Sequence, residues 1–249
     1  MPRFFVRREQ IDGDRVRITG DDAHHISRSL RMAAGEHITV CDMQSKEYDC
    51  VLERFDEDSV SALIVSARES ENEPACYVRL FQALPKGDKL DTVIQKAVEC
   101  GVCRIVPFES ERCVVRAKPD SEQRKTERRR RIALEAAKQC GRGALPEVLE
   151  TVPFSDMLRL ADGADTVFFC YEGDGTLPIG TLLAKTDLSV NSSIALIIGS
   201  EGGFSLKEAQ MASEKGFCMT GLGPRILRTE TAPLFALACI SCHFELSDL

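Results

Sequence analysis

The sequence predicts an α/β protein in two parts: a small β-barrel over residues 1–72 and an α/β domain over residues 73–249. Three observations support this prediction. Residues before 70 form short strand-like runs between turn signals, whereas residues after 75 alternate apolar strand-like runs with amphipathic helical stretches. Between them, "RESENEP" (68–74) is charged, lacks apolar residues, ends in proline and is typical of a linker.

The first part should contain five strands and one helix. Residues of high strand propensity recur in five runs between turn signals, at 3–6, 15–19, 37–41, 47–55 and 59–67. A helical stretch over residues 21–31 interrupts them, with Asp21 or Asp22 as its expected N-cap. Several short strands at this spacing are typical of a small β-barrel.

The second part should contain five strands and four helices. The strands are expected at 76–84, 102–108, 166–172, 193–199 and 217–223, and the helices at 88–101, 121–141, 205–216 and 234–246. Ser205 is the expected cap of the third helix, and Thr231 with Pro233 should start the fourth. Apolar strands between amphipathic helices indicate a mostly parallel sheet that is covered on both faces.

Composition places the chain among soluble globular proteins. Charged residues make up 29% of the sequence and hydrophobic residues 43%. The first residues, "MPRFFVRREQ", lack the apolar core of a secretory signal. The longest uncharged stretch, residues 231–244, is shorter than the roughly 20 residues that a membrane helix needs. We therefore expect a cytoplasmic protein that does not span a membrane.

Eleven cysteines raise the question of disulfides or metal binding. An odd number in a long chain without a secretory signal argues against a disulfide framework. Cys100/Cys103 and Cys239/Cys242 have a spacing found in zinc and haem sites, but each pair lies within periodic apolar elements instead of a knuckle loop. We expect these thiols to pack as small apolar groups, and we expect no metal site.

Charge is distributed unevenly along the chain. The formal net charge is −7, yet residues 73–150 carry an excess of basic over acidic side chains. This segment contains "RKTERRRR", residues 124–131. Such a run is either a solvated helix face paired with Glu122 and Glu127 or part of a surface for a polyanion, and the run alone leaves both interpretations open.

Two glycine-rich loops follow expected strands of the second part. The stretch "IALIIGSEGGFS" leaves its strand at Gly199 and enters a capped helix. The stretch "FCMTGLGPRILRTETAP" places Arg228 and Glu230 directly before the last helix, where a cap and a proline would suffice. Loops beyond the carboxyl ends of strands bind ligands in open α/β sheets. Neither loop has a dinucleotide or phosphate-loop signature, so we expect another kind of ligand.

These loops and several other segments resemble the RsmE family, the 16S rRNA uridine N3-methyltransferases of the SPOUT superfamily. The resemblance rests on "IGSEGGF" and "LGPRILRTETA", together with "PRFFV", "HHISRSLRMAAGE", "LPKGDKLDTVIQKAVECGV", "PFESERCVV" and "AAKQCGRGALPEV", which occur in family order through most of the chain. Ser200 stands where the family usually has Pro, and Pro233 where Ala is commoner. Neither departure removes a functional group.

The resemblance implies a PUA-like β-barrel followed by a SPOUT α/β domain whose C-terminal segment forms a trefoil knot. It also implies a homodimer that binds S-adenosylmethionine in the knot and methylates uridine N3 of 16S rRNA, on the small ribosomal subunit. The cofactor-binding residues that it implies are Ile198, Gly199, Glu201, Gly203, Leu222, Gly223, Ile226, Leu227, Arg228, Thr231 and Ala232.

Methylation at uridine N3 requires help with the N3 proton, because this nitrogen has no free in-plane lone pair until that proton leaves. Arg228 is the expected stabiliser of the resulting anion. Glu230 either orients Arg228 or accepts the proton, and Glu201 is the third candidate catalytic residue. The identity of the base stays open at this point.

Ribosomal RNA is the expected partner, held through its phosphates and its shape. The expected RNA-binding residues are Arg3, His24, His25, Arg28, Arg31, Lys86, Lys89, Arg112 and Arg142. For the two histidines, an equally good interpretation is one packing residue and one exposed residue. Two alternative functions are another SPOUT methyltransferase with a different RNA target and a non-catalytic RNA-binding protein that retains the fold.

Overall fold

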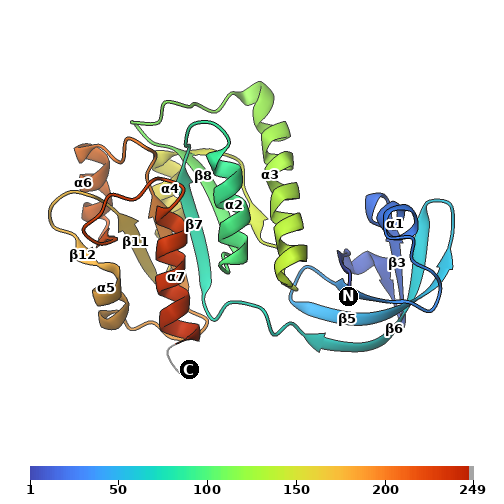
Figure 1. The fold of residues 1–249 in the computed structure, drawn as a ribbon. Helices are drawn as coiled ribbons and strands as arrows, with labels where there is room; N and C mark the ends of the chain where they lie inside the picture. The colour runs from blue at the N-terminus through green and yellow to red at the C-terminus, as the bar shows by residue number, and fades with distance from the viewer. Residues whose placement is uncertain (247–249) are drawn as a thin grey trace. The chain divides into compact units, whose positions relative to one another are not determined.

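The computed structural model describes residues 1–246 and divides into two compact units (Figure 1). The first unit comprises Met1–Glu73 and Ala137–Leu145, and the second comprises Pro74–Ala136 and the residues from Pro146 onward. The chain therefore passes into the second unit at Pro74. Residues 137–145 pack with the N-terminal residues, although they follow a long stretch of the second unit in the sequence.

The first unit is built on one six-stranded sheet with the strand order β1-β4-β5-β6-β3-β2. Neighbouring strands are antiparallel except β1 and β4, which run parallel. All five strands expected from the sequence are present. The elements of this unit are β1 (Arg3–Phe5), η1 (Arg8–Gln10), β2 (Ile11–Asp12), β3 (Arg15–Thr19), α1 (Asp21–His24), η2 (His25–Ser29), β4 (His37–Cys41), β5 (Lys46–Phe55) and β6 (Ser59–Glu69).

The core of the first unit forms because its strands alternate inward and outward side chains. In β3, Val16 and Ile18 are buried while their neighbours are exposed. Ile26 of η2 belongs to the same core as Phe4 and Ile38, so the inserted helix packs onto the sheet. This packing explains why the helix interrupts the strands without leaving the unit.

The helical insertion does not begin as the sequence suggested. Gly20 occupies the N-cap position with φ +67°, a conformation that glycine adopts readily. Asp21 and Asp22 lie in the first turn, and no side chain caps this helix. The cap prediction is therefore wrong, and Asp22 instead accepts a hydrogen bond of 2.8 Å from Lys138.

The charged stretch at residues 68–74 is not a free linker. Strand β6 continues through Glu69. Glu73 accepts hydrogen bonds from the Arg142 side chain at 2.8 Å and from the N–H groups of Gly143 and Ala144 at 2.8 and 3.0 Å. The stretch does join the two units, whose boundary is at Glu73 and Pro74, but its first two residues still pair in the sheet and the Glu73 carboxylate is bound within the first unit.

The second unit is built on a sheet in which every strand pair is parallel. The main strand order is β10-β8-β7-β13-β11-β14-β12, and β9 pairs with β8. The mostly parallel sheet predicted from the sequence is confirmed. The strands of this unit are β7 (Tyr77–Ala83), β8 (Arg104–Glu109), β9 (Glu147–Val148), β10 (Val152–Pro153), β11 (Thr166–Cys170), β12 (Leu177–Pro178), β13 (Ser193–Ile198) and β14 (Cys218–Gly221).

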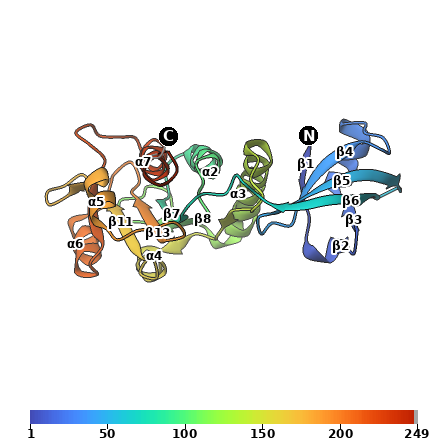
Figure 2. The same ribbon diagram turned by 90° about the horizontal axis from the view of Figure 1, so that it is seen from below.

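Helices cover both faces of this sheet. Figure 2 shows α2 and α7 on one side of the strands and α4 and α6 on the other. Helices α4 and α5 were not expected from the sequence, and α5 contacts α7. The helices are α2 (Lys89–Glu99), α3 (Pro119–Cys140), α4 (Phe154–Ala161), α5 (Ile179–Lys185), α6 (Leu206–Glu214) and α7 (Ala232–Glu245).

The parallel arrangement positions the candidate site. Strands β11, β13 and β14 are neighbours, so the loops after them leave the same edge of the sheet. Strand β13 carries "IALIIGSEGGFS" and β14 carries "GPRILRTETA" beyond its end. Among the residues described, no helix combines the length and apolar character needed to cross a membrane.

Candidate functional site

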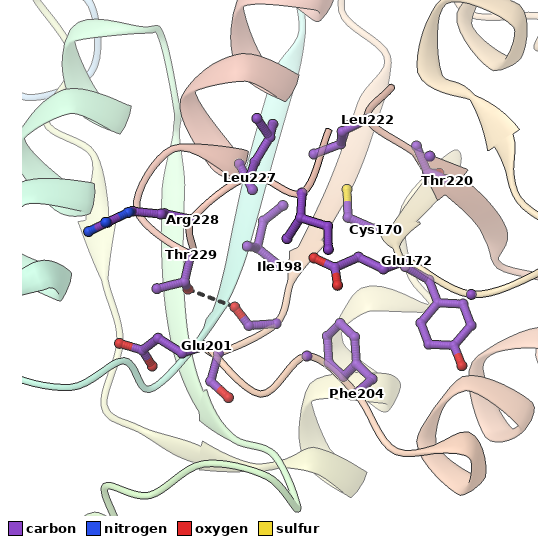
Figure 3. Close-up of a pocket in the computed structure, with 18 of the residues that line it drawn as sticks. Cys170, Glu172, Ile198, Glu201, Phe204, Thr220, Leu222, Leu227, Arg228 and Thr229 are labelled. Carbon is purple, nitrogen blue, oxygen red and sulfur yellow. Dashed lines mark hydrogen bonds between the residues drawn. The ribbon is translucent and has the colours of Figure 1, made fainter. Parts of the chain in front are cut away.

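Three loops enclose a cavity of about 810 Å³ at this edge of the sheet (Figure 3). Its lining comes mainly from residues 198–204 after β13, residues 220–229 after β14 and residues 170–176 after β11. Lys89, Arg112 and Ala232 complete it. The two glycine-rich loops identified in the sequence thus meet at one cavity.

The loop after β13 is shaped by close backbone contacts. A Cβ at Gly199 would lie 3.2 Å from both the Gly203 Cα and the Phe204 ring, which leaves almost no room for a side chain. Gly203 has φ +62° and donates its N–H to the Ser200 carbonyl at 2.9 Å. Only glycine satisfies both conditions without strain, so the two positions fix the turn.

Helix α6 anchors the end of the same loop. The Ser205 hydroxyl accepts from the Glu208 N–H, and the Glu208 carboxylate accepts from the Ser205 N–H, which completes a capping box and confirms the predicted cap. Glu208 is buried and also accepts from the Ser110 hydroxyl and the Glu111 N–H, at 3.2 and 2.8 Å. The segment after β8 is therefore held against the start of α6.

Thr229 links the loop after β14 to the loop after β13. Its buried hydroxyl donates to the Gly199 carbonyl at 2.7 Å. The Gln82 amide donates to the Thr229 oxygen at 3.1 Å and to the Gly199 carbonyl at 3.3 Å. The sequence analysis assigned no role to Thr229 or Gln82, because both contacts join residues far apart along the chain.

Helix α7 starts differently from the prediction in one respect. Thr231 occupies the N-cap position, but its backbone is already helical and its side chain makes no cap hydrogen bond. Its N–H and that of Ala232 both donate to the Arg228 carbonyl, at 2.8 and 2.9 Å, so the preceding turn is closed by the backbone. The side-chain cap prediction is wrong, whereas Pro233 does lie in the first turn, as expected.

A charged cluster lies beside the cavity. Lys89 Nζ contacts Glu201 Oε1 at 3.0 Å and Glu230 Oε2 at 3.3 Å. Burial alone would raise the pKa of Glu201, but hydrogen bonds from Lys89 and from backbone N–H groups outweigh it, so this pKa is lowered. Glu230 therefore pairs with Lys89, whereas the sequence had suggested Arg228 as its partner.

Arg228 is exposed, and the described residues provide no hydrogen-bond or ion-pair partner for its guanidinium. Figure 3 shows its side chain directed away from Glu172, toward the same side of the cavity as Glu201. An arginine without internal partners at a cavity edge is available to a ligand. Arg228 thus has the freedom that its expected role requires.

The cofactor-binding residues expected from the sequence are brought together with one exception. Ten of the eleven line the cavity, and Thr231 does not. Ile226 is 82% exposed, so it stands at the rim. The members that line the cavity are Ile198, Gly199, Glu201, Gly203, Leu222, Gly223, Ile226, Leu227, Arg228 and Ala232.

The sequence analysis missed the loop after β11. Cys170, Glu172 and Thr176 line the cavity, and Figure 3 shows the Glu172 side chain directed inward, toward Ile198. The available signal was "CYEGDGT", which follows an apolar strand and contains two glycines. Burial raises the pKa of the Cys170 thiol, so this thiol stays protonated at neutral pH and is a poor nucleophile.

The fold and the cavity can now be compared with known proteins. A model of the RNA methyltransferase domain matches residues 71–241, and a model of the RNA methyltransferase PUA domain matches residues 18–65. The ribosomal RNA small subunit methyltransferase E of Bacillus subtilis is 35% identical over 252 residues, which cover 99% of this chain and 98% of that protein. The chain belongs to the ribosomal RNA small subunit methyltransferase E family.

Other members of the methyltransferase E family agree with this assignment. The protein of that name from Synechocystis is 33% identical, and the match covers 98% of this chain and 78% of the Synechocystis protein. A crystal structure of the member from Neisseria gonorrhoeae, bound to S-adenosyl methionine, has 30% identity and a TM-score of 0.84, covering 98% of both chains. The family resemblance seen in the sequence is therefore confirmed.

Two arginines expected to bind RNA lie inside the first unit of this methyltransferase E chain. Arg3 Nη1 lies 2.5 Å from Glu47 Oε1, and the Arg3 side chain is only 13% exposed. The Arg142 side chain is 4% exposed and pairs with Glu73 at 2.8 Å. Both guanidinium groups are thus engaged in internal ion pairs, and their contact with RNA stays a prediction.

The inserted helix presents the other residues expected to bind RNA. His25, Arg28 and Arg31 are exposed, and His25 lies on η2, a π-helical turn. Arg31 has φ +52°, which residues other than glycine adopt rarely. His24 is partly buried, with Nε2 at 3.9 Å from Asp58. The exposed side chains of this group are open to a ligand, and their contacts with RNA stay a prediction.

Of the remaining cations, Lys89 and Arg112 line the cavity, and Lys86 lies next to the lining residue Glu201. The Lys86 side chain is exposed, and its N–H donates to Glu201 at 3.1 Å. Arg112 donates to the Gly202 carbonyl at 3.1 Å. Lys89 is held by two carboxylates, as described above. Of the three, Lys89 alone is held in an ion pair, whereas Arg112 contacts a backbone carbonyl and the Lys86 side chain has no hydrogen-bond or ion-pair partner among the described residues.

Proposed function

We propose that this protein uses S-adenosylmethionine to methylate N3 of a uridine in 16S rRNA of the small ribosomal subunit. Family membership supports methylation of small-subunit rRNA, and the observation that carries the chemistry is the cavity itself. It combines apolar walls with Arg228, Glu201 and the Lys89–Glu230 pair at one side. Uridine N3 carries a proton that must leave before methylation, so a carboxylate that accepts it and a cation that stabilises the anion suit this position.

The cavity fits the proposed cofactor. Ile198, Leu222 and Leu227 provide apolar walls for an adenine ring. The Ser200 hydroxyl is buried in the lining without a hydrogen-bond partner among the described residues, so it is available to a polar ligand. The Glu172 carboxylate suits a ribose diol or an ammonium group. When bound, S-adenosylmethionine supplies the methyl group as an electrophile.

The chain's own residues act on the uracil. Removal of the N3 proton places negative charge on the two carbonyl oxygens of the base. Arg228 stabilises that charge through its planar guanidinium. Among the described residues this guanidinium has no hydrogen-bond or ion-pair partner, so no internal contact has to break before it binds the uracil. Either Glu230 or Glu201 receives the proton, directly or through water. Much of the remaining rate comes from holding N3 in line with the methyl donor.

Recognition of the RNA is assigned to exposed cations of both units. His25, Arg28 and Arg31 form one group on the inserted helix of the region matched by the PUA model. Lys86 is exposed next to the cavity-lining Glu201, from where it contacts a phosphate beside the target base. We place the protein in the cytoplasm, where ribosomal subunits are assembled.

The trefoil knot and the homodimer belong to the same proposal. Strand β14 lies between β11 and β12, and the chain then turns at residues 222–231 into α7, which contacts α2 and α5 on one sheet face. The knot is proposed from the family resemblance, and this strand order is the observation that supports it. On α7, Phe235 and Ala238 remain exposed although the helix is apolar, which supports a second copy as the partner of that face.

The decisive experiment measures the modified nucleoside. Small ribosomal subunits from cells that lack the gene are incubated with the purified protein and S-adenosylmethionine, and their nucleosides are analysed by mass spectrometry. The proposal expects 3-methyluridine in 16S rRNA of wild-type cells, its absence in the deletion strain and its return after incubation. Formation of a different methylated nucleoside would indicate another RNA target, and cofactor binding without any methylation would indicate an RNA-binding protein.

A further inference from the structure

Lys89 joins the two loops that form the candidate site. It is the first residue of α2, and its Nζ contacts Glu201 from the loop after β13 and Glu230 from the segment after β14, within 3.3 Å of each. The Lys89 side chain is 32% exposed and the Glu230 side chain 23%. One ammonium group therefore bridges two carboxylates from segments about thirty residues apart in sequence.

This geometry argues against a primary phosphate contact for Lys89. An RNA phosphate would have to compete with two carboxylates that already surround the ammonium. The hydrogen bond to Glu201 raises the pKa of Lys89, so the ammonium stays charged and bound to its partners. Lys86 differs, because its exposed side chain has no carboxylate partner among the described residues.

We propose that Lys89 is a positioning residue for methyl transfer, which bridges the Glu201 and Glu230 carboxylates and holds the loops that carry them in register. This inference rests on the proposed function, because it assigns the proton acceptor to a carboxylate whose charge Lys89 maintains. Lys89 itself contacts neither cofactor nor uracil in this scheme. Its effect passes through the two carboxylates.

The electrostatic argument follows from the spacing of the charges. Without the ammonium, Glu201 would lose the hydrogen bond from Lys89 that lowers its pKa and would face the Glu230 charge uncompensated, so it would hold a proton at higher pH. Glu230 Oε2 is buried and has no aligned hydrogen-bond donor, so no other described group replaces Lys89 there. The other charged groups near this cluster are Lys86, Asp88, Arg112, Arg228 and the Arg128–Asp91 pair.

Those neighbours do not substitute for Lys89. Arg112 is directed to the Gly202 carbonyl, and Arg128 is paired with Asp91. Asp88 is 89% exposed and adds only a screened negative charge. Lys86 meets Glu201 through its backbone N–H and not through its ammonium, and the proposed reaction uses Arg228 on the uracil. Loss of Lys89 should therefore raise the pH below which the site is inactive.

The test compares Lys89→Met with two controls. Lys96→Met removes another lysine from α2 together with its ion pair to Glu99, away from the cavity. Lys86→Met removes the exposed neighbouring charge. Single-turnover methylation of small subunits is measured at saturating enzyme across the acid limb of the pH profile, together with the pH dependence of S-adenosylmethionine binding.

For Lys89→Met, we expect the acid limbs of the methylation profile and of the cofactor-binding profile to move to higher pH by about one unit. On its acid limb, the methylation rate then falls about tenfold. Lys89→Arg should restore the position of the limb, because it restores the charge. Lys96→Met should leave both profiles unchanged, and Lys86→Met should weaken RNA binding without moving either limb. Unshifted limbs in Lys89→Met, with RNA affinity lost as in Lys86→Met, would overturn the inference and make Lys89 a phosphate contact.

The two readouts separate this inference from the proposed function. If the wild-type protein forms no 3-methyluridine, the proposed function fails, and cofactor binding alone then tests Lys89 through Glu201. A shift of the acid limb of cofactor binding in Lys89→Met supports the pairing of Lys89 with Glu201, and an unshifted limb overturns it. Thermal melting of each variant identifies a folding defect. If Lys89→Met is defective, the test uses Lys89→Arg and Lys89→Gln instead. The inference then requires that the acid limb stays in place in Lys89→Arg and moves to higher pH in Lys89→Gln.

Discussion

Thr229 joins two loops of the candidate site through one buried hydroxyl, so its removal should be felt in both stability and binding. Thr229→Val keeps the shape but leaves the Gly199 carbonyl without its 2.7 Å donor. Gln82 still donates to that carbonyl at 3.3 Å but loses the Thr229 oxygen as an acceptor, so we expect the free energy of unfolding to fall by about 1 kcal/mol, the net worth of one buried hydrogen bond. Affinity for S-adenosylmethionine should fall with it. Denaturant unfolding and calorimetry measure the two effects, and Thr229→Ser should preserve both.

Arg228 offers the cleanest separation of chemistry from binding. Because its guanidinium has no internal partner among the described residues, Arg228→Ala should leave the fold intact. The single-turnover rate should fall by roughly 10²–10³, the effect of losing one preorganised donor, while cofactor affinity stays nearly unchanged. Arg228→Lys should restore only part of the rate.

The control for Arg228 is an arginine outside the cavity. Arg159 on α4 is 77% exposed and pairs with Asp156, so Arg159→Ala should leave the methylation rate unchanged. Loss of cofactor binding in Arg228→Ala, with a normal rate once the cofactor saturates, would contradict the stabiliser role and make Arg228 part of the cofactor site.

At this scale, the sequence predicted which residues gather but not how they pair. Glycine positions and the strand-to-loop pattern identified most of the cavity lining. The partner of Glu230 could not be read from the sequence, since Lys89 lies on a helix far upstream and only the sheet order brings it near. Thr231 was misread for a local reason: a good capping residue lost that role to a backbone turn.

Glu47 on β5 ties together several elements of the first unit. Its carboxylate is 3% exposed and accepts from Arg3 near β1, Arg68 on β6 and Ser70 beyond it. Glu47→Ala leaves Arg3 without its carboxylate in a largely buried site, so we expect a loss of about 3–5 kcal/mol in stability. Glu53→Ala, which breaks an exposed pair with Arg15, should cost less than about 1 kcal/mol.

The difference in the free energy of unfolding between the wild-type protein and Glu47→Ala should depend on pH. Burial alone would raise the pKa of Glu47, but the hydrogen bonds from Arg3 and Ser70 lower it. A carboxylate whose pKa is lower in the folded state than its unfolded value of about 4.3 stabilises the fold. This stabilisation is complete above the unfolded pKa and is lost as the pH falls through the folded-state pKa. Chemical denaturation at several pH values should therefore show the gap narrowing in acid, and a widening gap would contradict this account.

Elements with a long periodic pattern were predictable, and elements made by their neighbours were not. Strand β13 and helix α6 were anticipated because an apolar run and a capping box mark them. Helix α4 spans only Phe154–Ala161, so its pattern covers about two turns and is weak. Strands β9, β10 and β12 have two residues each and exist because β8 and β14 pair with them.

For the whole molecule, the sequence predicted two parts and a parallel sheet, because the change in hydrophobic pattern reflects the change in architecture. It could not predict the strand order, in which β13 lies between β7 and β11, since pairing partners far apart in sequence leave no local signal. Nor could it predict that Ala137–Leu145 packs with the first unit. That segment is held by Glu73, in a stretch that resembled a linker.

The last prediction concerns the assembly. Phe235 on the apolar helix α7 is 38% exposed, and burial of that face in a second copy would remove it from water. Light scattering at micromolar concentration should therefore report a dimer for the wild-type protein. Phe235→Glu should weaken the dimer by about 2 kcal/mol or more, roughly 30-fold, because it places a charge in an apolar contact.

Leu206 supplies the matched control for Phe235. It is 78% exposed and begins α6, which lies on the opposite face of the sheet from α7 (Figure 2). Leu206→Glu adds the same charge to another exposed apolar position, so it should leave the dimer unchanged. A wild-type monomer would contradict the proposed homodimer. Equal weakening by both substitutions would show that added charge, and not the α7 face, controls association.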